Sequence, residues 1–130
     1  MRMTRVSMGL GLLWVALLCA CSAGDVGWVP APQSWQDITI TMETQPSPIR
    51  QGMNEFILVA NHQQRGFIND LLVEVHTEDS GWKQAIPDGA LGVFRKALLV
   101  RDVHHDHLYV RLTRGTQHGE MVFAFAPKKP

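Results

Sequence analysis

Apolar and polar residues alternate along several short stretches of the chain, which is the pattern of β-strands with one buried face. The clearest stretch is 108–113, where every second residue is a large aliphatic one. The stretches 36–43, 71–76 and 121–125 show the same period of two. We predict a half-buried strand at each of the four.

Three further stretches have other patterns. Asn54–Ala60 is apolar on both faces, as expected of a strand deep in a sheet. Gly92–Val100 is long enough for a helix, but its β-branched and aromatic residues and its glycines favour a strand. Trp82–Ile86 lies between two groups of turn residues and predicts a short strand. We expect the segments 61–69 and 115–119 to be turns.

Seven short strands at this spacing, with no helical pattern after the first 20 residues, predict an all-β fold. We expect an immunoglobulin-like sandwich of two sheets. The predicted domain spans 34–130. The segment 21–33, rich in Gly and Pro, is predicted to be a flexible tether in front of it.

Two of the strand entries carry a family resemblance. Pro48–Phe56, with the sequence PIRQGMNEF, and the later triplet Gly92-Val93-Phe94 resemble those of the YtkA-like and FixH-like immunoglobulin-type domains. The chain departs from that pattern at Arg65–Asp70 and at His107–Tyr109. The resemblance implies a small exported accessory domain, sometimes associated with membrane redox complexes, with no catalytic residues.

Residues 1–20 have the pattern of an export signal, with two arginines before a run of apolar and small residues. The run from Met8 to Ala20 is shorter than the about 20 residues of a membrane-spanning helix. The motif Leu18-Cys19-Ala20-Cys21 resembles the lipobox of bacterial lipoproteins. The resemblance implies cleavage after Ala20, a diacylglycerol group on Cys21 and further acylation, with palmitate as a typical acyl chain.

The lipobox resemblance also implies a location. The protein is expected on the periplasmic face of the bacterial cell envelope, and Ser22 after the lipidated cysteine suggests the outer membrane. The alternative is an ordinary secretory signal cleaved near Ala23, which removes Cys21. Both cysteines of the chain lie in this region, so the predicted domain has no internal disulfide.

The charge balance bears on the partners. The chain has 12 basic and 12 acidic residues, and without Arg2 and Arg5 the remainder is slightly acidic. With no basic excess or cluster, nucleic acid is not an expected partner. We also find no Gly-x-Ser-x-Gly nucleophile motif, phosphate-binding loop or paired carboxylates, so we expect neither an enzyme nor a small-molecule substrate.

The segment His104-His105-Asp106-His107 is the densest group of side chains able to bind a metal. In an extended chain His105 and His107 lie on the same side, where two imidazoles can converge on copper or zinc. A usable site commonly takes another ligand from a second segment, for which His62, His76 and His118 are available. The alternative is an ordinary polar turn.

Copper sites favour thioether ligands. The chain after residue 20 has three methionines, Met42, Met53 and Met121, none of them in a Met-x-Met or His-x-Met pattern. Met42 and Met121 fall on the predicted inward strand faces, where we expect them to be part of the core.

Trp82 allows two interpretations, because it begins a short strand beside Lys83 and Gln84. It either packs in the core, which we favour, or is an exposed aromatic at a partner-binding surface. The sequence thus predicts a lipid-anchored envelope accessory protein without catalytic activity, which binds another envelope protein or a membrane complex. The alternative is a periplasmic copper- or zinc-binding module that uses His104, His105 and His107.

Overall fold

The computed structural model describes residues 27–130 except 63, 65, 69, 90 and 91, and this part of the chain consists of strands, turns and loops. The predicted leader, Cys21 and Ser22 lie outside the described residues. The strands are β1 (Gln33–Trp35), β2 (Ile38–Gln45), β3 (Gly52–His62), β4 (Gly66–Phe67), β5 (Leu72–His76), β6 (Lys83–Gln84), β7 (Ile86–Pro87), β8 (Val93–Val100), β9 (His107–Arg114) and β10 (Gln117–Ala124).

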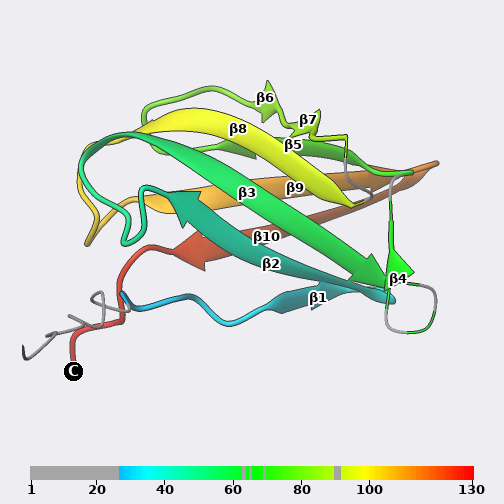
Figure 1. Cartoon of the computed structure of the whole chain (residues 1–130), viewed down its shortest axis with the longest axis horizontal. Helices are drawn as coiled ribbons and strands as arrows, with labels where there is room; N and C mark the ends of the chain where they lie inside the picture. The colour runs from blue at the N-terminus through cyan, green and yellow to red at the C-terminus, as the bar shows by residue number, and fades with distance from the viewer. Residues whose placement is uncertain (1–26, 63, 65, 69, 90–91) are drawn as a thin grey trace, which may run out of the picture.

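The strands form two antiparallel sheets that face each other (Figure 1). One sheet has the order β1-β2-β3-β8-β7, with β4 paired to the end of β3, and the other has the order β10-β9-β5-β6. With β2 as the first strand of the fold, these are the A-B-E-D and G-F-C orders of immunoglobulin domains, with β6 added beside the third strand. The predicted all-β immunoglobulin-like sandwich is confirmed.

The period of two places the aliphatic residues between the sheets. In β9, Leu108, Val110 and Leu112 are completely buried. Strand β3, which was predicted to lie deep in a sheet, pairs with β2 on one side and β8 on the other. The segment predicted as the strand Gly92–Val100 forms strand β8, which begins at Val93. Gly92 belongs to the preceding turn. Met42 and Met121 belong to the core, as predicted.

The predicted strand Trp82–Ile86 is wrong, because the chain changes sheets within it. Strand β6 pairs with β5 in the four-stranded sheet, whereas β7 pairs with β8 in the opposite one. Ala85 stands between them with 2% of its surface exposed, and its amide donates a hydrogen bond to the Val73 carbonyl (2.8 Å). A small side chain fits where the backbone passes from one layer to the other.

Two predicted turns are shorter than expected. Strand β3 continues to His62 and is joined there by β4, and β10 begins at Gln117 directly after a turn at 115–116. The polar residues of these segments are compatible with strands because they lie at sheet edges and ends, where one face is open to water.

Strand β1, which starts at the last residue of the predicted tether, closes one side of the sandwich. It pairs with β2 but also contacts β10 of the other sheet, where the Gln33 side chain donates to the Val122 carbonyl (2.6 Å). The Trp35 indole lies so close to Gly119 that a Cβ added there would be 2.2 Å from it. Glycine at position 119 therefore makes room for the tryptophan that links the two sheets.

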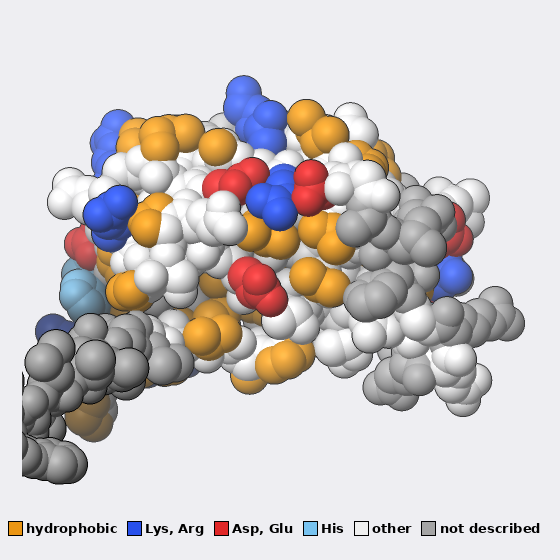
Figure 2. All heavy atoms as spheres, in the orientation of Figure 1, with side chains coloured by type: hydrophobic (Ala, Val, Ile, Leu, Met, Phe, Trp, Pro, Cys, Tyr) orange, Lys and Arg blue, Asp and Glu red, His pale blue; other side chains and the backbone are white. Residues whose placement is uncertain are grey.

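The outer face of the six-stranded sheet mixes both signs of charge with apolar side chains (Figure 2). On this face Arg95 lies between Asp88 (2.6 Å) and Glu55 (3.3 Å). Within the described part of the chain there is no helix with the length and apolar character needed to cross a membrane.

Candidate functional site: the outer face of the four-stranded sheet

The outer face of the β10-β9-β5-β6 sheet carries aromatic and charged side chains at the positions that alternate with the buried aliphatic ones. Strand β9 presents His107, Tyr109, Arg111 and Thr113 outward, all partly exposed. The register sets Tyr109 opposite His76 and Arg111 opposite Glu74. Cross-strand neighbours of this kind lie close enough to interact directly.

Trp82 lies over this face and not in the core. The Arg111 guanidinium is 3.9 Å from the centroid of the indole ring, and the His76 ring meets the indole in a T-shaped arrangement with a centroid distance of 4.3 Å. The indole is partly exposed and does not belong to the buried cluster between the sheets. The core interpretation that we favoured for Trp82 is wrong, because the crossing at Ala85 leaves Trp82 outside the sandwich.

Arg111 is held from both sides. Glu74 of β5 and Glu120 of β10 are its cross-strand neighbours, and their carboxylates lie 3.7 and 3.1 Å from the guanidinium nitrogens. The planar guanidinium keeps its charge at all physiological pH values and is well suited to stacking on an aromatic ring. The two ion pairs orient it for the contact with Trp82.

His76 and Tyr109 stack almost face to face, with a centroid distance of 4.4 Å and an interplanar angle of 7°. The Nδ1 atom of His76 lies 2.8 Å from the Thr77 carbonyl oxygen. A carbonyl only accepts, so Nδ1 carries the proton and donates it, which leaves Nε2 of the neutral ring as an acceptor. We call Trp82, Arg111, His76 and Tyr109 together the Trp82 face.

Glu78 borders the Trp82 face and links Tyr109, a member of that face, to His107. Its carboxylate accepts hydrogen bonds from the Tyr109 hydroxyl (3.1 Å) and the His107 backbone amide (2.8 Å), and lies 3.0 Å from the His107 Nδ1. Partial burial by itself raises the pKa of the Glu78 carboxyl, but the hydrogen bonds from His107 and Tyr109 outweigh it and hold that pKa below its ordinary value. The hydrogen bond to Glu78 in turn raises the pKa of the Tyr109 hydroxyl.

The loop after β5 fixes the position of Glu78. Thr77 is completely buried, and its hydroxyl donates to the Leu99 carbonyl at the end of β8 (2.8 Å). The Thr77 amide donates to the Ser80 hydroxyl (2.9 Å). These bonds tie the loop to the opposite sheet, so Glu78 projects from a well-supported turn.

The candidate metal ligands do not have the geometry that the sequence suggested. Residues 103–105 form a turn, in which the amides of His105 and Asp106 donate to the Asp102 carbonyl (3.2 and 2.8 Å). The extended chain that we assumed for His105 and His107 is therefore wrong. His105 pairs with Asp102 (2.6 Å), and His107 contacts Glu78 on the other side.

Asp106, the fourth member of the histidine segment, is buried and has a structural role. Its carboxylate accepts hydrogen bonds from the amides of Arg101 (2.7 Å) and Asp102 (3.1 Å), which closes the turn. A hollow of about 300 Å³ beside the turn is lined by His104, His105 and His107, together with the end of the chain. Among the residues that the structure describes, no three His, Cys, Asp or Glu side chains are grouped so that they could hold a metal ion.

The second-segment histidines lie in separate places. His76 belongs to the Trp82 face, and His118 contacts Thr113 on the outer face of β9 and β10. His62 is buried at the end of β3, where its Nε2 contacts Asp37 and its Nδ1 accepts the amide proton of Gln64. With both ring nitrogens bonded, this Asp–His pair has the features of a structural contact between the β1–β2 turn and the end of β3.

The sequence pointed to Trp82 but not to the residues on which it rests. Arg111, Tyr109 and His76 are outward residues of strands that were correctly predicted, so their outward orientation could be predicted from the alternation of apolar and polar residues. Their contact with Trp82 could not be predicted, because it depends on the crossing at Ala85 and on which strands are neighbours.

Comparisons with protein-family models, with curated proteins and with solved structures find no match to this chain.

Proposed function

We propose that this chain is a lipoprotein of the bacterial cell envelope, anchored through Cys21, which binds another envelope protein through the Trp82 face and has no catalytic activity. The observation that carries the binding role is the assembly of Trp82, Arg111, His76 and Tyr109 on an outward sheet face. The anchoring role is supported by the lipobox-like motif at 18–21.

The composition of the Trp82 face supports a protein partner. Trp, Tyr and Arg are the residue types that contribute most often to binding energy at protein interfaces. Here the two ion pairs of Arg111 and the His76–Tyr109 stack already restrict the side chains. Restricted side chains lose less conformational entropy on binding, which favours affinity. The core between the sheets is formed by other residues, so packing alone does not require this assembly.

Site-specific photo-crosslinking in the cell envelope tests this proposal. A photoreactive residue at Gln84 or at Val122, which are exposed opposite Glu74 and Tyr109 of the outer face, should give a discrete crosslinked species. The matched control is Ala97, which is exposed on the outer face of the opposite sheet and should not give that species. Trp82→Ala should abolish the crosslinks from Gln84 and Val122. The same species from Ala97, or crosslinks unaffected by Trp82→Ala, would contradict the proposal.

The alternative function is a periplasmic copper- or zinc-binding module, and the hollow lined by His104, His105 and His107 favours it. A site of this kind should bind one equivalent of Cu(II) or Zn(II) in isothermal titration. Its affinity should fall as pH decreases through about 6.5, where free histidine gains a proton. The double change His105→Ala and His107→Ala should remove the binding, whereas His118→Ala should not. Weak binding in several equivalents would exclude a dedicated site.

A further inference from the structure

One end of the sandwich gathers the chain termini and several exposed apolar residues. The described chain starts there, and its C-terminus lies at the same end (Figure 1). We call it the chain-entry end and define it by residues 27–32, the loop 46–51, the turn 101–106 and residues 125–130. Gly27 lies next to Pro48 of the loop, Trp28 and Phe125 line one cavity, and the turn 101–106 lines another together with residues 126–129, so these segments are neighbours.

The chain-entry end exposes large apolar side chains. Trp28 is 44% exposed and Val29 is 58% exposed, and both stand at its outer surface. Met53 (62%) and Leu99 (39%) are cross-strand partners at the start of β3 and the end of β8, next to the loop and the turn. Exposed apolar residues concentrated in one place mark interaction surfaces more often than isolated ones do.

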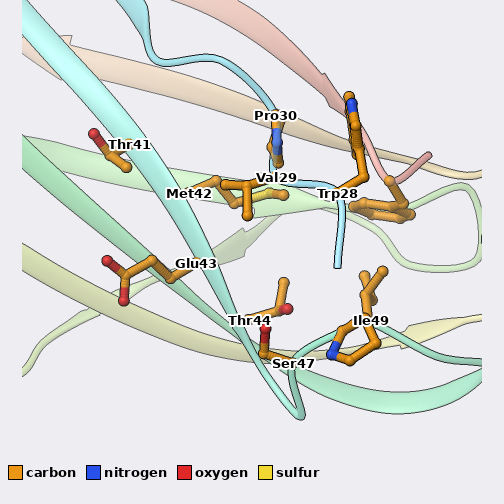
Figure 3. A pocket seen from close by; sticks show the side chains of 11 residues that line it. Trp28, Val29, Pro30, Thr41, Met42, Glu43, Thr44, Ser47 and Ile49 are labelled. Carbon is orange, nitrogen blue, oxygen red and sulfur yellow. The ribbon is translucent and has the colours of Figure 1, made fainter. Parts of the chain in front are cut away.

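Beneath Trp28 and Val29 the surface is hollowed. A cavity of about 340 Å³ is open at this end, with Trp28, Val29 and Pro30 on one side and Thr44, Ser47 and Ile49 on the other (Figure 3). The Glu43 carboxylate also belongs to the lining but points away from Trp28 (Figure 3). The Trp28 indole therefore stands at the rim of a hollow, partly in water.

Basic side chains are also found at the chain-entry end, and at this end of the molecule Figure 2 shows side chains of Lys or Arg together with a histidine. Arg50, Lys128 and Lys129 are exposed, and within the described residues none of them has an ion pair. Among the acidic groups nearby, Asp79 contacts Arg101 (2.8 Å) and Asp102 contacts His105, while the Glu43 carboxylate points away from Trp28. The cationic groups are thus available to an anionic partner.

We infer that the chain-entry end docks on the surface of an anionic lipid bilayer. This inference rests on the proposed lipid anchor, because Cys21 precedes Trp28 by seven residues, which span at most about 25 Å. An anchor so close brings this end of the sandwich to the membrane. Tryptophan prefers the membrane interface, and each Lys or Arg near an anionic surface adds to the attraction. Apolar and basic residues together at the end next to the anchor fit that surface.

Quenching of tryptophan fluorescence by brominated lipids tests the docking. The lipidated protein, from which Trp14 has been removed with the leader, is reconstituted in vesicles of phosphatidylcholine and phosphatidylglycerol with brominated acyl chains. Trp28→Phe should lose most of the lipid-dependent quenching, whereas Trp82→Phe should retain it. Met53→Ser should weaken the quenching, whereas Ile86→Ser should not, although Ile86 is equally exposed (62%) on β7. Equal quenching in wild type and Trp28→Phe would overturn the docking.

A second measurement separates failure of the docking from failure of the anchor. The Cys21→Ser chain that starts at residue 21 has neither the leader nor the lipid, so its binding to vesicles that contain phosphatidylglycerol reports the surface alone. Replacing Lys128 and Lys129 by Gln should weaken this binding roughly fivefold for each lysine. Mass spectrometry of the wild-type protein tests the lipid itself. A lipidated protein whose Cys21→Ser form ignores anionic vesicles keeps the anchor and overturns the docking. An unlipidated protein that still binds them through Trp28 keeps the docking without the anchor.

Discussion

The guanidinium of Arg111 stacks on the indole of Trp82 at 3.9 Å, although Trp82 directly precedes β6, which is not adjacent to β9, the strand of Arg111. Strand β5 separates β9 from β6, so Trp82 reaches across His76 to make this contact. The interaction lies outside the core and is oriented by Glu74 and Glu120. It can therefore be altered with little effect on folding, which makes it suitable for separating binding from stability.

Removal of the Trp82–Arg111 contact should cost little stability. Cation–π pairs at exposed sites contribute about 0.5–1 kcal/mol. We expect a double-mutant cycle with Trp82→Ala and Arg111→Ala, measured by urea unfolding, to give a coupling energy in that range. A coupling energy above about 2 kcal/mol would indicate that the contact belongs to the folding core. The crosslinks to a partner should be lost in the single variant Trp82→Ala all the same.

Burial of a charge on the inner face should be severe. Val110 is completely buried in the middle of β9, so Val110→Asp places a carboxylate among aliphatic side chains. We expect the free energy of unfolding to fall by about 4 kcal/mol or more. The matched control is Val122→Asp on the neighbouring strand, where the side chain is exposed and the cost should be about 1 kcal/mol or less. Equal melting temperatures for the two variants would contradict the assignment of inner and outer faces.

The strands were predictable where a local pattern reports burial. Leu108, Val110 and Leu112 mark their own inward face through alternation, and so do Met121 and Phe123. The crossing at Ala85 was not predictable, because strands β6 and β7 beside it have only two residues each, and two residues cannot show an alternation of apolar and polar positions.

The candidate site was predictable only in part. Trp82 was identified, but its surroundings depend on strand order, which a single sequence does not specify. The histidine segment was expected to be extended, whereas Asp106 accepts two backbone amides and bends it into a turn. Side-chain bonds to the backbone of this kind compete with strand geometry and are difficult to infer from spacing.

The closure of the sandwich by Trp35 gives a prediction about Gly119. A methyl group at that position would overlap the indole, so Gly119→Ala should displace Trp35 and destabilise the protein by about 1–3 kcal/mol. Gly81→Ala is the matched control, because a Cβ at Gly81 meets open space. Denaturant unfolding of both variants, together with the fluorescence of Trp35, checks the prediction. Equal stability of the two variants would mean that Trp35 does not pack on Gly119.

The low pKa of Glu78 predicts a dependence of stability on pH. A carboxyl whose pKa is lowered by folding stabilises the protein above its ordinary value of about 4.5. That contribution is lost as pH falls through the lower pKa of the folded state. Glu78→Gln should therefore be less stable than wild type at about pH 5.5, and the difference should shrink toward about pH 3. Glu43→Gln, which changes an exposed carboxylate of β2 outside this network, should show no such convergence. A constant difference between Glu78→Gln and wild type would mean that the hydrogen bonds to His107 and Tyr109 do not favour the ionised carboxylate.

The proposed anchor predicts that one cysteine is essential and its neighbour is not. Lipid transfer in bacterial lipoproteins needs a thiol at the position that becomes the new N-terminus, so Cys21→Ala should abolish incorporation of labelled palmitate. Cys19→Ala is the matched control, because it restores a residue common at that position of the motif and leaves the Cys21 thiol in place. We expect the Cys19→Ala variant to be labelled and to remain in the membrane fraction, whereas the Cys21→Ala variant leaves it or accumulates with its leader uncleaved. Several acyl chains at about 0.8 kcal/mol per buried CH₂ anchor a protein durably, so the two fractions should separate clearly. Palmitate incorporation that persists in Cys21→Ala would disprove the anchor.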